Sequence, residues 1–320
     1  MNTMLMLVRR EFWEHRSLWI APLVWAGLIV VMSMWGTLLS MQFEDAVLIG
    51  HHANIEEIPG LGAQEREELS KAIALPADQK ATVFAMMQIV LAGVISGLVL
   101  VVVFFYLIDC LYAERRDRSI LFWKSMPVSD AQVVLSKLAV ALVVMPLAVL
   151  ALATVTQLIL SLIFWIRFNG TVLGDIVPAF SFSGWLGAMW ASFVFSLGGV
   201  LWYVPVAGYL MIMSVWARRA VFLWAVLPPL GLMLIEKMFF NSEHVAKFVG
   251  RRLVGFVQEM KVHSDQFNQG GTEHVPTIGQ VFDSVSFSGL FMHYELWLGL
   301  LAGAALIYAT IRIRRYRDES

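Results

Sequence analysis

The chain has 320 residues, of which 59% are hydrophobic and 15% are charged, and its mean hydropathy is +0.72. Soluble domains average about 25% charged residues, so this composition excludes an ordinary soluble domain and predicts an all-α integral membrane protein. The single cysteine, Cys110, excludes an internal disulfide and a cysteine-based metal cluster, and the formal net charge of −1 gives no indication of a nucleic-acid partner.

Residues 1–17 predict a helix that lies flat on the cytosolic surface of the membrane. Leu5 and Phe12 share one face of this helix. Arg10 and Glu14 are four residues apart, which is the spacing of a helical ion pair. We therefore expect an interfacial helix with an apolar side toward the lipid.

Residues 18–41 carry no charge and reach roughly 36 Å as a helix, enough to cross a hydrocarbon core of about 30 Å. Residues 42–80 then hold eight acids against three bases, and we predict that they form an outer loop. Within this loop, 63–75 is typical of a polar helix that Pro76 stops. The pair His51-His52 could be read as a metal site, but adjacent loop histidines are usually solvated, so we expect no metal.

Residues 112–137 form a charged island between two long uncharged stretches. The preceding stretch, 81–108, has 28 uncharged residues, and the following one, 138–166, has 29. Both are long enough to cross a membrane, so we predict a second span at about 81–111 and a third at 138–166.

The island itself predicts a short helix followed by a sharp break. An amphipathic turn fits 119–125, and Pro127 ends it because proline disfavours helix in the residue before it. Ser129 can then cap the next helix. The candidate contact residues are Glu114, Arg115, Arg116, Asp117, Arg118, Ser119, Ile120, Leu121, Phe122, Trp123, Lys124 and Pro127.

This arrangement resembles the permease subunits of ABC-2 type ABC transporters. Their cytosolic link between the second and third spans reads roughly Glu-Arg, a small residue, two apolar residues, Pro-Val/Leu-Ser/Thr, and a Lys entering the next span. The matching positions here are Glu114-Arg115, Ser119, Ile120-Leu121, Pro127-Val128-Ser129 and Lys137. The resemblance implies that 112–137 holds a coupling helix that docks on an ATPase subunit. The other interpretation is an ordinary positive cytosolic loop.

Residues 176–217 are 42 residues without a charge, which fits either one long helix from about 183 or two short spans. The positive-inside rule favours one span at 183–217. It places Arg218-Arg219 and the C-terminal arginines Arg312, Arg314, Arg315 and Arg317 in the cytosol. Gly198-Gly199 and Pro205 allow a bend or a close helix approach.

The fifth span is predicted at 220–240 and the sixth at 290–311, with a second outer loop at 241–289. That gives six spans with both termini in the cytosol. Pro228 and Pro229 interrupt the fifth span and are interpreted either as a hinge or gate, or as a simple kink. Glu236 and Glu295 lie near the outer ends of their spans. They could act as a functional pair or as interface anchors.

The sequence contains no Gly-x-x-x-x-Gly-Lys-Ser/Thr loop, no His-Glu-x-x-His helix and no Gly-x-Ser-x-Gly turn. We therefore expect no catalytic, cofactor-binding or metal-binding residues, and the chain would not be an enzyme. The resemblance implies an exporter in the bacterial cytoplasmic membrane, with two copies of an ATPase that binds ATP and Mg²⁺ and with either a second copy of this permease or a homologous permease. The alternatives are a non-transporting membrane anchor or immunity protein, and an intramembrane enzyme.

Overall fold

The computed structural model describes residues 3–42, 62–120, 128–178, 180–262 and 291–316, and all regular structure in these ranges is helical. The prediction of an all-helical chain is confirmed for this part. Several predicted features lie outside it. They are Leu121, Phe122, Trp123, Lys124 and Pro127 of the island, the His51-His52 pair, and much of the two outer loops.

Within the described ranges, six helices are long and apolar enough to cross a membrane, which agrees with the predicted number. These six are α2 (Ser17–Gln42), α4 (Ala77–Arg116), α6 with α7 (Asp130–Phe168), α9 (Phe182–Trp216), α10 (Val221–Phe240) and α15 (Tyr294–Tyr316). The other helices are α1 (Thr3–Glu14), α3 (Ala63–Ile73), α8 (Val172–Ile176) and α11 (His244–Val262). The uncharged stretch 176–217 thus holds one continuous long helix.

The ends of these helices follow from local chemistry. Pro76 directly precedes α4. Ser129 caps α6 in a capping box: its side chain accepts from the Gln132 amide at 3.2 Å, and the Gln132 side chain accepts from the Ser129 amide at 3.0 Å. Between α6 (Asp130–Ala139) and α7 (Met145–Phe168) lies one π-helical turn, η2 (Val140–Val144). Pro146 follows it, and the wide turn accommodates a residue that cannot donate to the helix ladder.

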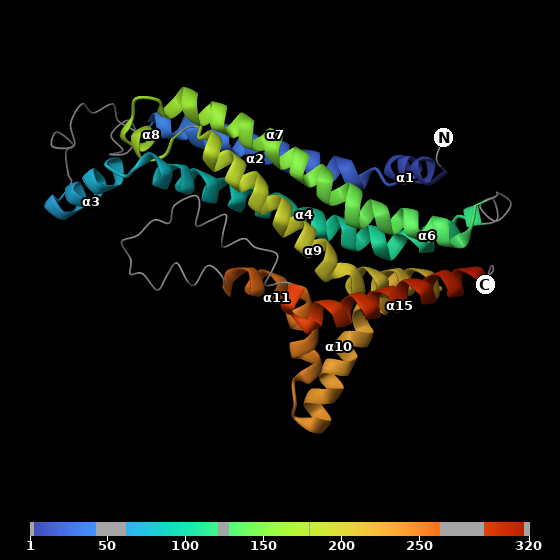
Figure 1. Ribbon diagram of the computed structural model, residues 1–320. Helices are drawn as coiled ribbons and strands as arrows, with labels where there is room; N and C mark the ends of the chain where they lie inside the picture. Colours follow the sequence, from blue (N-terminus) through green and yellow to red (C-terminus); the bar gives the residue numbers. More distant parts are fainter. Residues whose placement is uncertain (1–2, 43–61, 121–127, 179, 263–290, 317–320) are drawn as a thin grey trace.

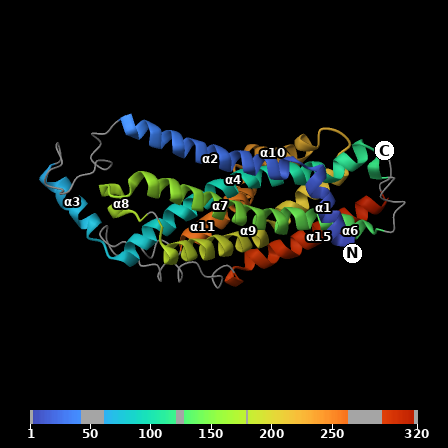
Figure 2. The same ribbon diagram turned by 90° about the horizontal axis from the view of Figure 1, so that it is seen from above.

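The long helices form an elongated bundle, with α4 and α9 in extensive contact at its centre (Figures 1 and 2). α2 and α7 pack on α4, and α15 packs along α9. α1 and the C-terminal end of α15 lie at one end of the bundle, here named the terminal end (Figure 1). α3 and α8 lie at the opposite end, here named the loop end.

Small residues allow the closest helix crossings. A Cβ added to Gly184 of α9 would lie 2.4 Å from the carbonyl oxygen of Ala81 in α4. A Cβ added to Gly303 of α15 would lie 2.6 Å from Val204 Cγ1 and 3.0 Å from the backbone nitrogen of Pro205. α9 therefore contacts α4 and α15 at distances that only glycine permits.

α10 leaves the bundle at a steep angle and forms a hairpin with α11 (Figure 1). The two buried residues of α10, Val221 and Ala225, both lie in its first two turns. Pro229 cannot donate to the Ala225 carbonyl, and the Tyr209 hydroxyl of α9 donates to that carbonyl instead, at 3.0 Å. The proline pair lies inside a continuous helix, and its role as a hinge or gate stays a prediction.

Candidate functional site

Four charged residues from four different helices are buried together at the terminal end. They are Glu11 of α1, Glu114 of α4, Lys137 of α6 and Arg314 of α15, with exposed fractions of 2%, 5%, 0% and 2%. Charged side chains are almost never fully buried unless they are paired. These four residues, with Asp130, are here named the ionic cluster.

Acids and bases alternate through the ionic cluster. Lys137 Nζ lies 2.7 Å from Glu11 Oε1 and 3.1 Å from Glu114 Oε1. Arg314 Nη2 lies 2.9 Å from Glu114 Oε2, and Arg314 Nη1 donates to the Asp130 carboxylate. The result is a chain of ion pairs that joins α1, α4, α6 and α15. Its three carboxylates and two cations sum to one negative charge.

Local structure places each member of the cluster. Glu114 lies in the last turn of α4, and Lys137 lies two turns after the Ser129 cap of α6. The two residues therefore lie near the two ends of the charged island, and their ion pair holds these ends together. Removing one partner of a buried pair typically costs about 3–5 kcal/mol, because the remaining charge is left without compensation.

Two aromatic residues border the cluster on the side of α1. The Tyr106 hydroxyl donates to Glu11 Oε2 at 3.1 Å, and the His15 ring packs edge-on against Tyr106 with 4.9 Å between ring centroids. Burial lowers the pKa of His15 below its ordinary value, while the nearby Glu11 carboxylate opposes this effect. The Glu11 carboxylate therefore has a hydroxyl, a lysine and an imidazole around it.

A second set of contacts joins α4 to the end of α9. Arg115 Nη2 donates to the carbonyl oxygens of Ser214 at 2.6 Å and Ala217 at 2.8 Å. These carbonyls belong to the C-terminal end of α9, where the last carbonyl oxygens have no N–H partner within the helix and carry negative partial charge. The Ser214 hydroxyl accepts from the amides of Leu111 and Tyr112, each at 3.1 Å. The terminal ends of α4 and α9 are thus held together.

The remaining described residues of the island divide into exposed and buried ones. The side chains of Arg116 and Asp117 are more than half exposed and pair with each other at 3.1 Å. Arg118 is exposed and has a positive φ of 55°. Ser119 donates to the Glu114 carbonyl at 3.3 Å, and Ile120 is buried at 4% exposure. The exposed residues of the island are therefore its charged ones, whereas Ser119 bonds to the end of α4 and Ile120 is buried.

The two candidate outer carboxylates, Glu236 and Glu295, both bind α11. Glu236 accepts hydrogen bonds of 2.7 Å from the Ser242 hydroxyl and from the amides of His244 and Val245. It thereby caps the start of α11. Glu295 Oε2 lies 3.0 Å from Arg251 Nε of α11. Each carboxylate therefore has a structural partner in the α10–α11 hairpin or beside it.

Sequence reasoning missed the roles of Glu11 and Asp130 and assigned Arg314 only to topology. Leu5, which we expect to face the lipid, is 66% exposed, whereas Leu7 and Glu11 are buried on the opposite side of α1. A signal for Glu11 was present, because Glu11 lies four residues after Leu7 and so shares a helix face with this apolar residue. An acid on such a face indicates a buried cation partner.

Comparison of the chain with protein-family models, curated proteins and solved structures found no match. The function is therefore inferred from the residues and their geometry.

Proposed function

We propose that this chain is the permease subunit of an ATP-driven exporter of the ABC-2 type, driven by a separate ATPase subunit that contacts residues 112–137. One observation carries the proposal. Glu114 and Lys137, which lie near the two ends of this segment, are buried in one ionic cluster with Glu11 and Arg314. A force on the segment would reach four helices at once.

The mechanism follows from the stiffness of that cluster. ATP and Mg²⁺ would act in the partner subunit, whose movement displaces the exposed side of the segment, including Arg116 and Arg118. The ends of α4 and α6 cannot separate without unpairing a buried charge, so they move as one body with α1 and α15. The end of α9 follows through Arg115. Helix tilting would then open the pathway on one side of the membrane.

The assembly that fits this proposal has two ATPase subunits and a second permease copy in the bacterial cytoplasmic membrane. α1 and the C-terminal end of α15 lie at the same end of the bundle (Figure 1). Arg115 and Arg116 end α4, next to Glu114, which pairs there with Arg314 of α15, and Arg118 follows two residues later. This placement agrees with a cytosolic location for all of them under the positive-inside rule.

The test is capture of the partner from native membranes. The tagged chain, cross-linked before solubilisation, is expected to co-purify with an ATPase that carries a Walker-type phosphate loop. Arg118→Glu reverses an exposed charge of the island and should weaken the complex by about tenfold. Lys71→Glu, an exposed charge reversal on α3 at the opposite end of the bundle, serves as the matched control. Recovery of no ATPase, or equal recovery with both variants, would refute the proposal.

A further inference from the structure

α1 has a buried side and an exposed side. The buried side carries Leu7 and Glu11, and Glu11 Oε1 lies 2.7 Å from Lys137 Nζ of α6. α1 packs on α6 and η2. These contacts determine which side of α1 faces away from the bundle.

The side that faces away combines large apolar residues with a cation. Leu5, Arg9 and Trp13 follow one another at a spacing of four residues and so lie on one helix face. Leu5 and Trp13 are 66% and 65% exposed, and Arg9 is exposed between them. Met6, which precedes Trp13 by seven residues, is exposed as well. These four residues are here named the exposed face of α1.

The arginines of this region are not neutralised by the acids of α1. Arg16 is exposed in the turn between α1 and α2. Neither Arg9 nor Arg16 forms an ion pair in the part of the chain that the structure describes, whereas Arg10 donates to Glu14 at 2.8 Å. Glu11, the other acid of α1, is engaged in the ionic cluster. The exposed face and Arg16 therefore carry two positive charges and no negative one.

The position of α1 brings its exposed face to the membrane surface. The first candidate span begins at Ser17, directly after Arg16. α1 lies at the terminal end of the bundle, where this span starts (Figures 1 and 2). Apolar side chains beside arginines are typical of a helix in the headgroup region, because the apolar groups enter the acyl boundary while the guanidinium groups stay among the phosphates.

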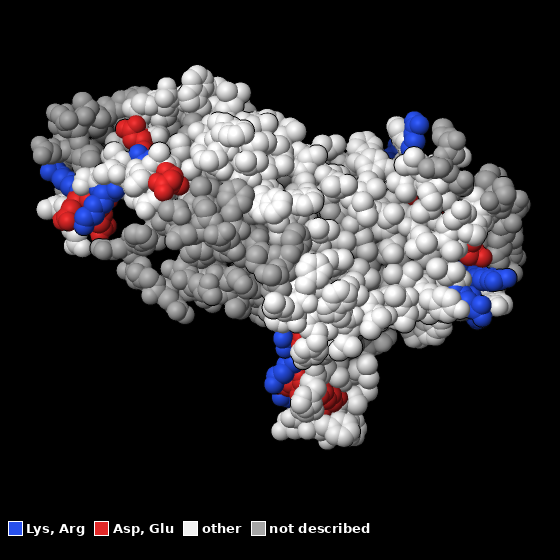
Figure 3. Space-filling model, viewed as in Figure 1, with Lys and Arg blue, Asp and Glu red and all other residues white. Residues whose placement is uncertain are grey.

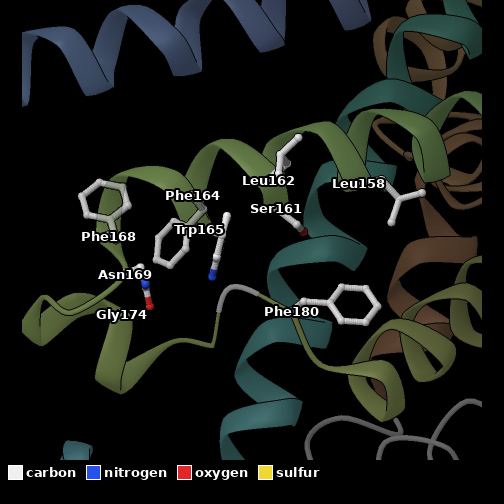
Figure 4. A pocket seen from close by; sticks show the side chains of 9 residues that line it. All are labelled: Leu158, Ser161, Leu162, Phe164, Trp165, Phe168, Asn169, Gly174 and Phe180. Atoms are coloured by element: carbon white, nitrogen blue, oxygen red, sulfur yellow. The ribbon is translucent and has the colours of Figure 1, made fainter.

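The loop end of the bundle offers a contrast. A cavity of about 520 Å³ beside α7 has an aromatic wall that includes Phe164, Trp165 and Phe168 (Figure 4). None of the residues that line this cavity is charged. An anionic headgroup would therefore find counter-ions at α1 and none at this cavity.

We propose that the exposed face of α1, together with Arg16, binds the headgroup of an anionic phospholipid in preference to a zwitterionic one. Leu5, Met6 and Trp13 enter the boundary between headgroups and acyl chains. Arg9 and Arg16 bind the lipid phosphate. An anionic lipid brings net negative charge to these arginines, whereas the ammonium group of a zwitterionic lipid repels them. The proposal needs no ATPase partner and goes beyond the proposed transport function.

The test measures which lipids surround α1 when the full chain is in nanodiscs. Leu5→Cys carries a bimane fluorophore, and only this cysteine is labelled because the native Cys110 is fully buried. Quenching by nitroxide-labelled phosphatidylglycerol should exceed quenching by the same mole fraction of nitroxide-labelled phosphatidylcholine by about twofold or more. Leu162→Cys is the matched control, because Leu162 is an exposed leucine that lines the uncharged cavity. Its label should be quenched equally by both lipids.

Charge removal tests the role of the arginines. Arg9→Gln combined with Arg16→Gln should bring the quenching ratio at Leu5→Cys to about one. Arg118→Gln removes an exposed charge outside α1 and should leave the ratio unchanged. Gel filtration identifies any variant that fails to fold.

Three results would overturn the proposal. If neither lipid quenches the label at Leu5→Cys, then water or another protein, and not lipid, covers the exposed face. Equal quenching by both lipids would show that this face contacts lipid without selecting its charge. If Arg118→Gln lowers the ratio as far as the loss of Arg9 and Arg16 does, the lipid responds to the overall charge of the terminal end and α1 is not its binding site.

Discussion

Lys137 is the residue on which the ionic cluster depends most directly. It is fully buried and lies between two carboxylates, Glu11 of α1 and Glu114 of α4. Without its charge, these two acids would face each other in a site closed to water. Because a buried charge without a partner costs several kcal/mol, the effect of losing Lys137 should exceed that of losing an exposed lysine.

We therefore expect Lys137→Met to destabilise the protein by about 3–5 kcal/mol, because methionine keeps the volume but leaves the buried Glu11 without a cation and Glu114 with Arg314 alone. Lys71→Met removes an exposed lysine that pairs with Glu67 at 2.9 Å, and should cost no more than about 1 kcal/mol. Thermal unfolding of both purified variants in the same detergent measures the difference. Equal midpoints would show that the cluster contributes nothing to stability.

For single residues, the sequence predicts contacts between residues that are close in the chain and misses contacts between residues that are far apart in the chain. The Arg10–Glu14 pair and the Ser129 cap follow from spacings of four and three residues, and both are confirmed. Lys137 and Glu11 are 126 residues apart, and no local pattern indicates which acid a lysine at the start of a span will meet. The cluster therefore required the tertiary structure.

The element that organises the bundle is α9, which packs against both α4 and α15. The uncharged stretch alone fits one long helix or two short spans, and the continuity of α9 could be predicted only by adding the positive-inside rule at Arg218-Arg219. The positions at which α9 closely contacts its neighbours could not be predicted, because they depend on where another helix crosses it. A Cβ added to Gly199 would keep an ordinary distance of 3.5 Å from Phe256, whereas the tight approach to α15 lies at Gly208 and Gly303.

Gly303→Ala should therefore separate α9 and α15 and destabilise the protein by about 1–3 kcal/mol. The new methyl group would clash with Val204 and with the backbone at Pro205. Gly97→Ala in α4 is the control, since no atom lies within 4 Å of its added Cβ, and helix propensity favours alanine by about 1 kcal/mol. Thermal unfolding in detergent should show opposite shifts. If Gly303→Ala left the unfolding temperature unchanged, α9 and α15 would not cross as closely as these distances indicate.

At the scale of the whole molecule, the charged side chains of the described residues gather at the two ends of the bundle and along the α10–α11 hairpin on the face drawn in Figure 3. Figure 3 shows the blue and red side chains in these three places, with an uncharged band over the middle of this face. Such a band is expected of a surface that contacts hydrocarbon. Six helices could be predicted from hydropathy, but the departure of α10 from the bundle could not. The hydropathy of the apolar residues of α10 is the same whether lipid or protein covers them, so it does not indicate where this helix lies.

Site-directed labelling tests the orientation. Asp117→Cys at the terminal end and Gln64→Cys on α3 are both exposed positions, and the native Cys110 is fully buried. A membrane-impermeant maleimide applied to intact cells should label Gln64→Cys only, and should label Asp117→Cys only after the cells are opened. Positive-inside topology is the physical reason. The reverse pattern would place residues 112–137 outside and remove any access for an ATPase.

The ionic cluster also has a consequence for biosynthesis. Glu11, Glu114, Asp130 and Lys137 all leave the ribosome before α15 is made, so the growing polypeptide carries three of these acids with a single cation. Arg314 supplies the missing counter-charge only when translation is nearly finished. A product cut short before α15 would retain three acids and one cation at this junction, so we expect it to be less stable than the full chain.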